Sequence, residues 1–188
     1  MLQILLEPSD NYTLPEQAQM AIEGGCTWLI ISADSMSDAE IRELAREAVP
    51  MCRDAGVILT ITGHPELAAE LGLHGMLLHA ADKPALIRQQ LGPEAIIGAI
   101  SASPERILEY DKADIDYICI TERRGAETIA AVRAAGSLIP FVAMGDYRVE
   151  DVPMLRFEGF NGVCTGKYVF EAQDPVAYIR HFLAAFAD

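Results

Sequence analysis

Eight short apolar segments divide this chain, and a segment with helical periodicity follows each of them. The apolar segments are Leu2–Glu7, Trp28–Ser32, Val57–Thr62, Gly75–His79, Ala95–Ile100, Ile115–Ile120, Ile139–Asp146 and Asn161–Gly166. An uninterrupted apolar segment bounded by Gly or Pro is typical of a strand buried on both faces, and such strands belong to parallel sheets. Successive segments begin roughly 18 to 29 residues apart, the size of one β/α unit.

The strict alternation of predicted strands and helices favours an α/β fold with a parallel sheet. Eight units favour closure into a compact (β/α)8 TIM barrel, and a doubly wound open sheet is the alternative. A chain of 188 residues is short for such a barrel, so its loops and helices are expected to be trimmed. The chain is predicted to form one domain over residues 1–188.

Local signals mark where the predicted helices begin and end. Helices are expected at Leu14–Glu23, Glu66–Glu70, Lys83–Gln90, Gly125–Ala135, Val149–Phe157 and Asp174–Phe186. Ser37 and Glu40 form a capping box at the start of a further helix, which Gly56 ends. Ser103 followed by Pro104 places an N-cap and a first-turn proline at the start of another.

The net charge limits the partners of this chain. Lysine and arginine number 14 against 28 acidic residues, which gives a formal net charge of -14. A field of this sign repels nucleic acid and anionic membranes, so neither is expected as a partner. It also repels a free diphosphate unless Mg2+ or a local basic cluster intervenes.

The cysteines and the first residues indicate a cytoplasmic protein. Cys26, Cys52, Cys119 and Cys164 show no metal-ligand spacing, and a disulfide framework or zinc site is not expected. Met1 leads directly into a strand-like segment without a basic region or a long apolar run.

Ligands of both α/β architectures bind outside the carboxyl ends of the strands, so the residues that follow each predicted strand are candidates for function. Asp34, His79 and Glu122 are the candidates for acid–base catalysis. The alternative for each is a solvated side chain or a cap on the next helix. Asp82 precedes Lys83, and it suits a metal ligand as well as an N-cap.

Gly145 and Gly166 follow the seventh and eighth predicted strands, where barrels hold phosphate on unhindered backbone amides. The alternative is that each glycine only satisfies a turn with positive φ. Lys167 adds charge at this corner, and Arg123 with Arg124 is the only adjacent basic pair near the strand ends. The remaining candidates for phosphate or substrate binding are Thr62, Ser101, Asp146 and Thr165.

Five segments resemble the thiamine phosphate synthase/TenI family, whose members are compact (β/α)8 barrels. They are His74–Asp82, Ile96–Ser103, Asp116–Ile118, Pro140–Gly145 and Gly159–Val163. The resemblance implies one of two reactions. The synthase couples a hydroxymethylpyrimidine diphosphate to a thiazole phosphate with the help of Mg2+, whereas the TenI branch aromatises a thiazole phosphate tautomer.

The resemblance assigns roles to three residues. It implies that Asp82 binds Mg2+, that Gly145 is the first glycine of the phosphate loop, and that Gly166 lies near the last phosphate-binding turn.

The chain departs from the family pattern at several strand ends. Ile30, Ser32 and Asp34 stand where the family has its Q-x-R-x-K diphosphate-binding motif. Thr62-Gly63 replaces an N-D pair whose Asp binds Mg2+, and Ile100 and Ala102 replace the Ser-x-His of strand five. The loop after strand six, residues 121–124, has no lysine, and Asp146 replaces the second glycine after strand seven.

Three hypotheses therefore stay open. The first is a thiamine phosphate synthase-like or TenI-like enzyme acting on a phosphorylated heterocycle, with Mg2+ as cofactor. The second is a non-catalytic barrel that keeps a phosphate-binding corner for a binding or regulatory role. The third is a barrel phosphate-lyase or isomerase with Asp34, His79 or Glu122 as base. A phosphorylated small molecule is the expected ligand, and a homodimer is expected although nothing specifies its interface.

Overall fold

The computed structural model describes residues 1–79, 82–121 and 125–187, and its strands close into a parallel barrel in the order β1 to β8. This confirms the predicted (β/α)8 barrel. The strands are β1 (Leu2–Leu6), β2 (Trp28–Ile31), β3 (Ile58–Thr62), β4 (Gly75–Leu78), β5 (Ile96–Ile100), β6 (Tyr117–Ile120), β7 (Phe141–Met144) and β8 (Gly162–Thr165).

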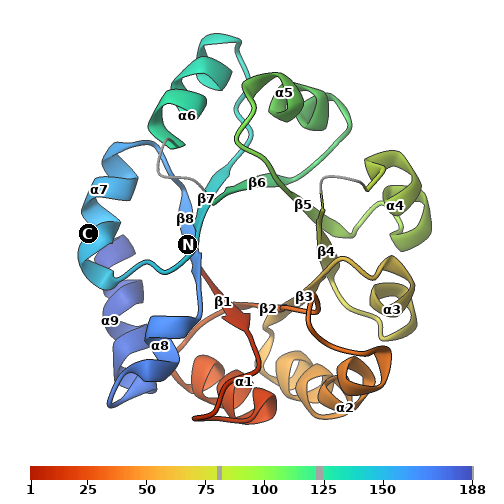
Figure 1. Ribbon diagram of the computed structural model, residues 1–188, viewed down its shortest axis with the longest axis vertical. Coiled ribbons are helices and arrows are strands. Elements are labelled where there is room, and N and C mark those ends of the chain that lie inside the picture. The colour runs from red at the N-terminus through yellow and green to blue at the C-terminus, as the bar shows by residue number, and fades with distance from the viewer. Residues whose placement is uncertain (80–81, 122–124, 188) are drawn as a thin grey trace.

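The helices form an outer ring around the barrel (Figure 1). They are α1 (Leu14–Glu23), α2 (Asp38–Ala55), α3 (Pro65–Glu70), α4 (Pro84–Leu91), α5 (Pro104–Lys112), α6 (Gly125–Ala134), α7 (Val152–Phe157), α8 (Lys167–Glu171) and α9 (Pro175–Ala187), with a 3-10 turn η1 (Val149–Asp151) before α7. Several helices have only five to ten residues, which is how eight units fit into this chain.

Every strand is shorter than its predicted segment, and two of them, β6 and β7, begin two residues later than predicted. The sixth was expected from Ile115, but the Ile115 N–H donates to Tyr110 O at the end of α5, and β6 begins at Tyr117. The seventh was expected from Ile139, but Pro140 has no N–H to donate, and β7 begins at Phe141.

The helix boundaries follow the predicted caps. Ser37 and Glu40 form the expected capping box of α2, and Gly56 ends that helix with a φ of 67°. The single helix predicted at Val149–Phe157 is a 3-10 turn followed by α7, whose second residue is Pro153. The short helix α8 was missed, because its five residues are too few to show a helical period.

Side chains of alternate parity along the strands fill two apolar layers. One parity, for example Ile4 and Leu29, packs against the helices in the larger core. The other, for example Ile30, Leu77 and Cys164, points into the barrel. This alternation is the pleat of the strands, and it decides which side chains reach the mouth of the barrel.

The ring of Tyr117 lies in the barrel interior, and Gly98, which has no side chain, leaves room for it. Its ring lies edge-on to Trp28, with centroids 5.2 Å apart, and a Cβ added to Gly98 would lie 2.3 Å from the ring. Burial raises the pKa of the Tyr117 hydroxyl, and the nearby Cys119 and Cys164 thiols add to the rise. The barrel is therefore filled as a core, with glycine making room for the largest ring.

Among the residues that the structure describes, none of the helices combines the length and hydrophobicity needed to cross a membrane.

We expect Gly98→Ala to lower the free energy of unfolding by about 2 kcal/mol, because the added methyl overpacks the barrel interior. Urea unfolding followed by circular dichroism measures this change. In a Tyr117→Leu background the same substitution should cost much less, because the ring that it meets is gone. An equal cost in both backgrounds would contradict the packing account.

Candidate functional site

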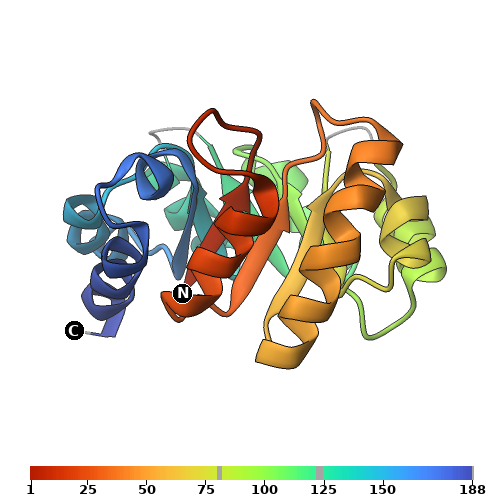
Figure 2. The same cartoon turned by 90° about the horizontal axis from the view of Figure 1, so that it is seen from below.

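The mouth of the barrel lies at the carboxyl ends of the strands, the side on which Figure 2 shows the loop between β1 and α1. Two predicted site residues continue the inward-facing parity of their strands, since Thr62 follows Thr60 and His79 follows Leu77 at even spacing. Asp34 lies in the turn after β2.

Asp34, Thr62 and His79 meet at a single carboxylate oxygen. His79 Nε2 lies 3.0 Å from Asp34 Oδ1, and the Thr62 hydroxyl donates to the same oxygen at 3.1 Å. Thr62 also accepts a hydrogen bond from the Ala33 N–H at 2.9 Å and is almost completely buried. Its hydroxyl therefore joins the ends of β2 and β3 and orients Asp34.

A second carboxylate bonds the backbone of His79. Asp82 Oδ2 accepts a hydrogen bond from the His79 backbone N–H at 2.7 Å, and the Asp82 N–H donates to His79 O. Asp82 does not cap α4, whose N-cap residue is Lys83. Gly63 completes the arrangement, because a Cβ there would lie 3.1 Å from the His79 ring.

Each of these carboxylates has one oxygen already engaged within the protein. One oxygen of Asp82 is held by the His79 backbone, and Asp34 Oδ1 is engaged with Thr62 and His79. Within residues 1–79, 82–121 and 125–187, no three His, Cys, Asp or Glu side chains come together as a metal group. Mg2+ is usually held by one or two carboxylates together with water and substrate phosphate, so Asp82 could hold it only with such further ligands, and the predicted use of Mg2+ stays a prediction.

The predicted phosphate corner lies across the barrel from these residues. Gly145 has a φ of 150°. Gly166 precedes α8, and a Cβ there would lie 2.5 Å from Leu5 O, so the backbone approach between β8 and β1 requires glycine. The first N–H groups of a helix have no partner within the helix and favour an anion. Gly145 is exposed but its N–H donates to Cys164 O at 3.0 Å, and Gly166 is buried, so the backbone N–H groups left for a phosphate are those at the start of α8.

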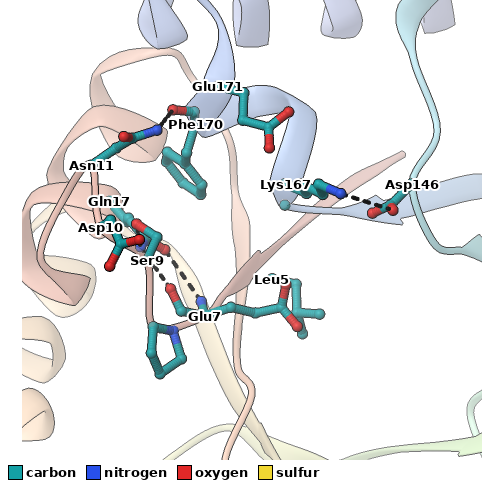
Figure 3. Close-up of a pocket in the computed structure, with 12 residues that line it drawn as sticks. Leu5, Glu7, Ser9, Asp10, Asn11, Gln17, Asp146, Lys167, Phe170 and Glu171 are labelled. Atoms are coloured by element: carbon teal, nitrogen blue, oxygen red, sulfur yellow. Dashed lines mark hydrogen bonds and ion pairs between the residues drawn. The ribbon is translucent and has the colours of Figure 1, made fainter.

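Lys167 and Asp146 point toward one another at this corner (Figure 3). Their Nζ and Oδ2 atoms are 3.9 Å apart, and both side chains are more than half exposed. A cavity of about 470 Å³ opens beside them, lined by Leu5, Glu7, Pro8, Ser9, Asp10, Asn11, Gln17, Asp146, Gly166, Lys167, Phe170 and Glu171. Lys167 is the only cation among these lining residues. The Asp146 carboxylate beside it partly neutralises its charge before any ligand binds.

Gln17 organises the wall of this cavity, and the sequence reasoning missed it. The Gln17 amide accepts from the Glu7 N–H at 3.2 Å and donates to Glu7 O at 2.7 Å (Figure 3). Its side chain is fully buried. The available signal was its position on α1 beside Ala18 and Ala21, where a glutamine interrupts the buried face.

Glu7 is the cavity residue with a perturbed carboxyl group. Burial raises its pKa, and repulsion from Asp146 and, more weakly, Asp34 adds to the rise, while a hydrogen bond from Ser32 opposes it. The Ser32 hydroxyl lies 3.5 Å from Glu7 Oε1. This wall of the mouth is therefore electrostatically crowded with carboxylates.

The remaining predicted residues divide into two groups. Thr165 is buried and donates its hydroxyl to Tyr147 O at 3.3 Å, and the Ser101 hydroxyl accepts from the Ser103 N–H at 3.2 Å. Both bonds hold loops in place, and phosphate binding by these residues stays a prediction. Glu122, Arg123 and Arg124, predicted as base and anion ligands, lie outside the described residues.

Comparison with known proteins identifies similar chains. A family model described as thiamine monophosphate synthase matches residues 2–169. A thiamine-phosphate synthase of Bacteroides fragilis is 31% identical over 97% of this chain and 98% of its own, and one of Bacteroides thetaiotaomicron is 30% identical over 97% and 95%. A solved thiamine phosphate pyrophosphorylase from Pyrococcus furiosus covers 99% of this chain and 95% of its own, with a TM-score of 0.83 and 20% identity.

We expect Glu7→Gln to raise the free energy of unfolding at pH 7 by no more than about 1 kcal/mol, because the group is only partly buried. A carboxyl whose pKa is raised by folding costs stability above that pKa and nothing below its ordinary value of 4.5. The gain should therefore disappear at pH 3.5. Urea unfolding at the two pH values tests this, with Glu171→Gln as a control expected to change little; a gain that persists at pH 3.5 contradicts the electrostatic cause.

Proposed function

Because the chain belongs to the thiamine monophosphate synthase family, we propose that it acts in thiamine biosynthesis on a phosphorylated heterocycle bound at the mouth of the barrel. The ligands proposed are a thiazole phosphate and thiamine phosphate, the two monophosphates of the synthase reaction. The relatives that carry the name thiamine-phosphate synthase are matched over nearly their whole length, which supports this assignment over a non-catalytic barrel.

The observation that carries the proposal is the corner formed by Gly145, Gly166 and Lys167. Two strand ends with glycine backbone lie next to the start of α8, and one ammonium group stands beside them. Backbone N–H groups and a lysine are the usual ligands of a phosphate monoester in a barrel of this kind. The phosphate is proposed to take the place of the Asp146 carboxylate next to Lys167.

Apolar side chains beside this corner suit the ring of the ligand. Leu5, Ile100 and Met144 are only partly buried and belong to the inward-facing layer of the barrel. They lie at the carboxyl ends of their strands, at the base of the mouth. A heterocycle seated there would cover apolar surface while its phosphate reaches the corner, the usual division of labour in small-molecule sites.

The proposed setting of this activity is the cytoplasm. The four cysteines are all free and buried, which supports a compartment where thiols stay reduced. A homodimer stays a prediction.

We expect thiazole phosphate and thiamine phosphate to raise the melting temperature of the protein, because each binds the native state alone. Lys167→Ala should weaken binding about tenfold by removing the only cation among the residues that line the cavity beside Asp146. Asp146→Asn should strengthen it several-fold, because the phosphate then meets less repulsion and an unpaired Lys167. Thermal-shift titrations with and without Mg2+ give the affinities.

Lys112→Ala is the matched control, because Lys112 ends α5 on the opposite side of the barrel and loses the same charge. It should leave both affinities unchanged. If neither phosphate shifts the melting temperature of the unmodified protein, the proposed function is wrong. If all three variants change binding alike, the corner is not where the phosphate sits.

A further inference from the structure

Two buried side chains inside the barrel carry polar atoms without a partner. Gln3 of β1 is 0% exposed and Tyr117 of β6 is 3% exposed. Among the residues that the structure describes, the Gln3 amide nitrogen and oxygen and the Tyr117 hydroxyl form no hydrogen bond. A buried polar group in a native protein is almost always hydrogen-bonded, either to protein or to ordered water. These three atoms therefore require a partner.

The neighbouring polar groups of the interior do not supply this partner. The Trp28 indole N–H donates to the Thr60 hydroxyl oxygen at 3.1 Å, and this hydroxyl donates to a backbone carbonyl of β2 at 3.4 Å. The Cys119 and Cys164 thiols act on the Tyr117 hydroxyl electrostatically. Neither thiol bonds it, and a thiol is in any case a weak hydrogen-bonding group.

The Gln3 amide and the Tyr117 hydroxyl are close to one another without being directly bonded. Burial raises the pKa of the Tyr117 hydroxyl, and the nearby Gln3 amide opposes part of this rise. The two groups nevertheless do not reach hydrogen-bonding geometry. An amide has a donor end and an acceptor end, and a direct bond to the hydroxyl would satisfy only one of them. A third group is needed for the other end.

We propose that an internal water molecule binds between Gln3 and Tyr117 inside the barrel and bridges the amide to the hydroxyl. Water donates two hydrogen bonds and accepts two, so one molecule can serve both an amide and a phenol. The surrounding layer includes Ile30, Leu77 and Val142, and such an apolar layer does not compensate the charge of an ion. The ligand of this site is therefore a small neutral molecule that both donates and accepts.

The water site is separate from the proposed phosphate corner. Gln3 and Tyr117 lie near the amino ends of their strands, whereas the mouth is at the carboxyl ends. In the barrel β1 and β6 are not neighbours (Figure 1), so the bridge connects two strands that do not pair with each other. The inference does not depend on the proposed function.

A crystal structure of the full chain at high resolution tests the site directly. We expect ordered density for a water molecule within hydrogen-bonding distance of both the Gln3 amide and the Tyr117 hydroxyl. In solution, oxygen-17 magnetic relaxation dispersion counts the long-lived internal waters. Their number should fall by about one in the double variant Gln3→Met with Tyr117→Phe, which removes the polar atoms and nearly keeps the side-chain shapes.

Thr60→Val is the matched control for the relaxation measurement. It removes a neighbouring interior hydroxyl that bonds directly to protein groups. The number of long-lived waters should therefore stay the same in this variant.

The equilibrium constant of folding gives a second readout. Gln3→Met or Tyr117→Phe alone should lower it about tenfold, because the water loses a partner and the remaining buried polar group is less well bonded. The double variant should lose less than the product of the two single losses, since apolar groups then replace both sides of the bridge. Urea unfolding of the unmodified protein and the three variants measures this.

Four results would overturn the proposal. The first is a crystal structure without water between Gln3 and Tyr117, whether or not the two side chains bond directly. The second is an unchanged number of long-lived waters in the double variant, shown to be folded by circular dichroism. The third is loss of the same water in Thr60→Val, which would assign it to Trp28 and Thr60. The fourth is a double variant whose loss equals the product of the single losses.

Discussion

The closure of eight parallel strands into a barrel determines where polar side chains can reach a ligand. In a closed barrel half of the side chains of each strand must fill the interior, and this one holds apolar groups, thiols, the ring of Tyr117 and the buried polar side chains of Gln3 and Thr60. Polar groups that reach solvent lie at the carboxyl ends of the strands, as Asp34 and His79 do. The fold thus collects them at one mouth, although they are far apart in the sequence.

Much of the fold was predictable because its signals are local. The apolar segments, the capping box of Ser37 and Glu40 and the stop at Gly56 each lie within a few residues of what they determine. The misplaced strand starts have a different origin. Ile115 lies outside β6, and its N–H donates to Tyr110 O at the end of α5. Such contacts leave no periodic pattern in the sequence.

The site was predictable as a set of strand ends but not as a set of contacts. The rule that ligands bind at the carboxyl ends of strands identified Asp34 and His79. No nearby residue in the sequence shows that the His79 ring reaches Asp34 Oδ1 or that the Thr62 hydroxyl bonds the same oxygen. Gln17 was missed for a similar reason. A buried glutamine on a helix gains its meaning from the backbone of Glu7, ten residues earlier, which it holds in place.

The two sides of the mouth depend on different parts of the chain. The proposed phosphate corner includes Gly166, which the close approach of Leu5 O requires whether or not a ligand is bound. The opposite side depends on side chains, which substitution alters without disturbing the barrel. Asp34 and His79 form a mutually supporting pair there, and Gly63 gives the imidazole its space. Substitutions at Asp34 or His79 can therefore change this side of the mouth while the barrel stays as it is.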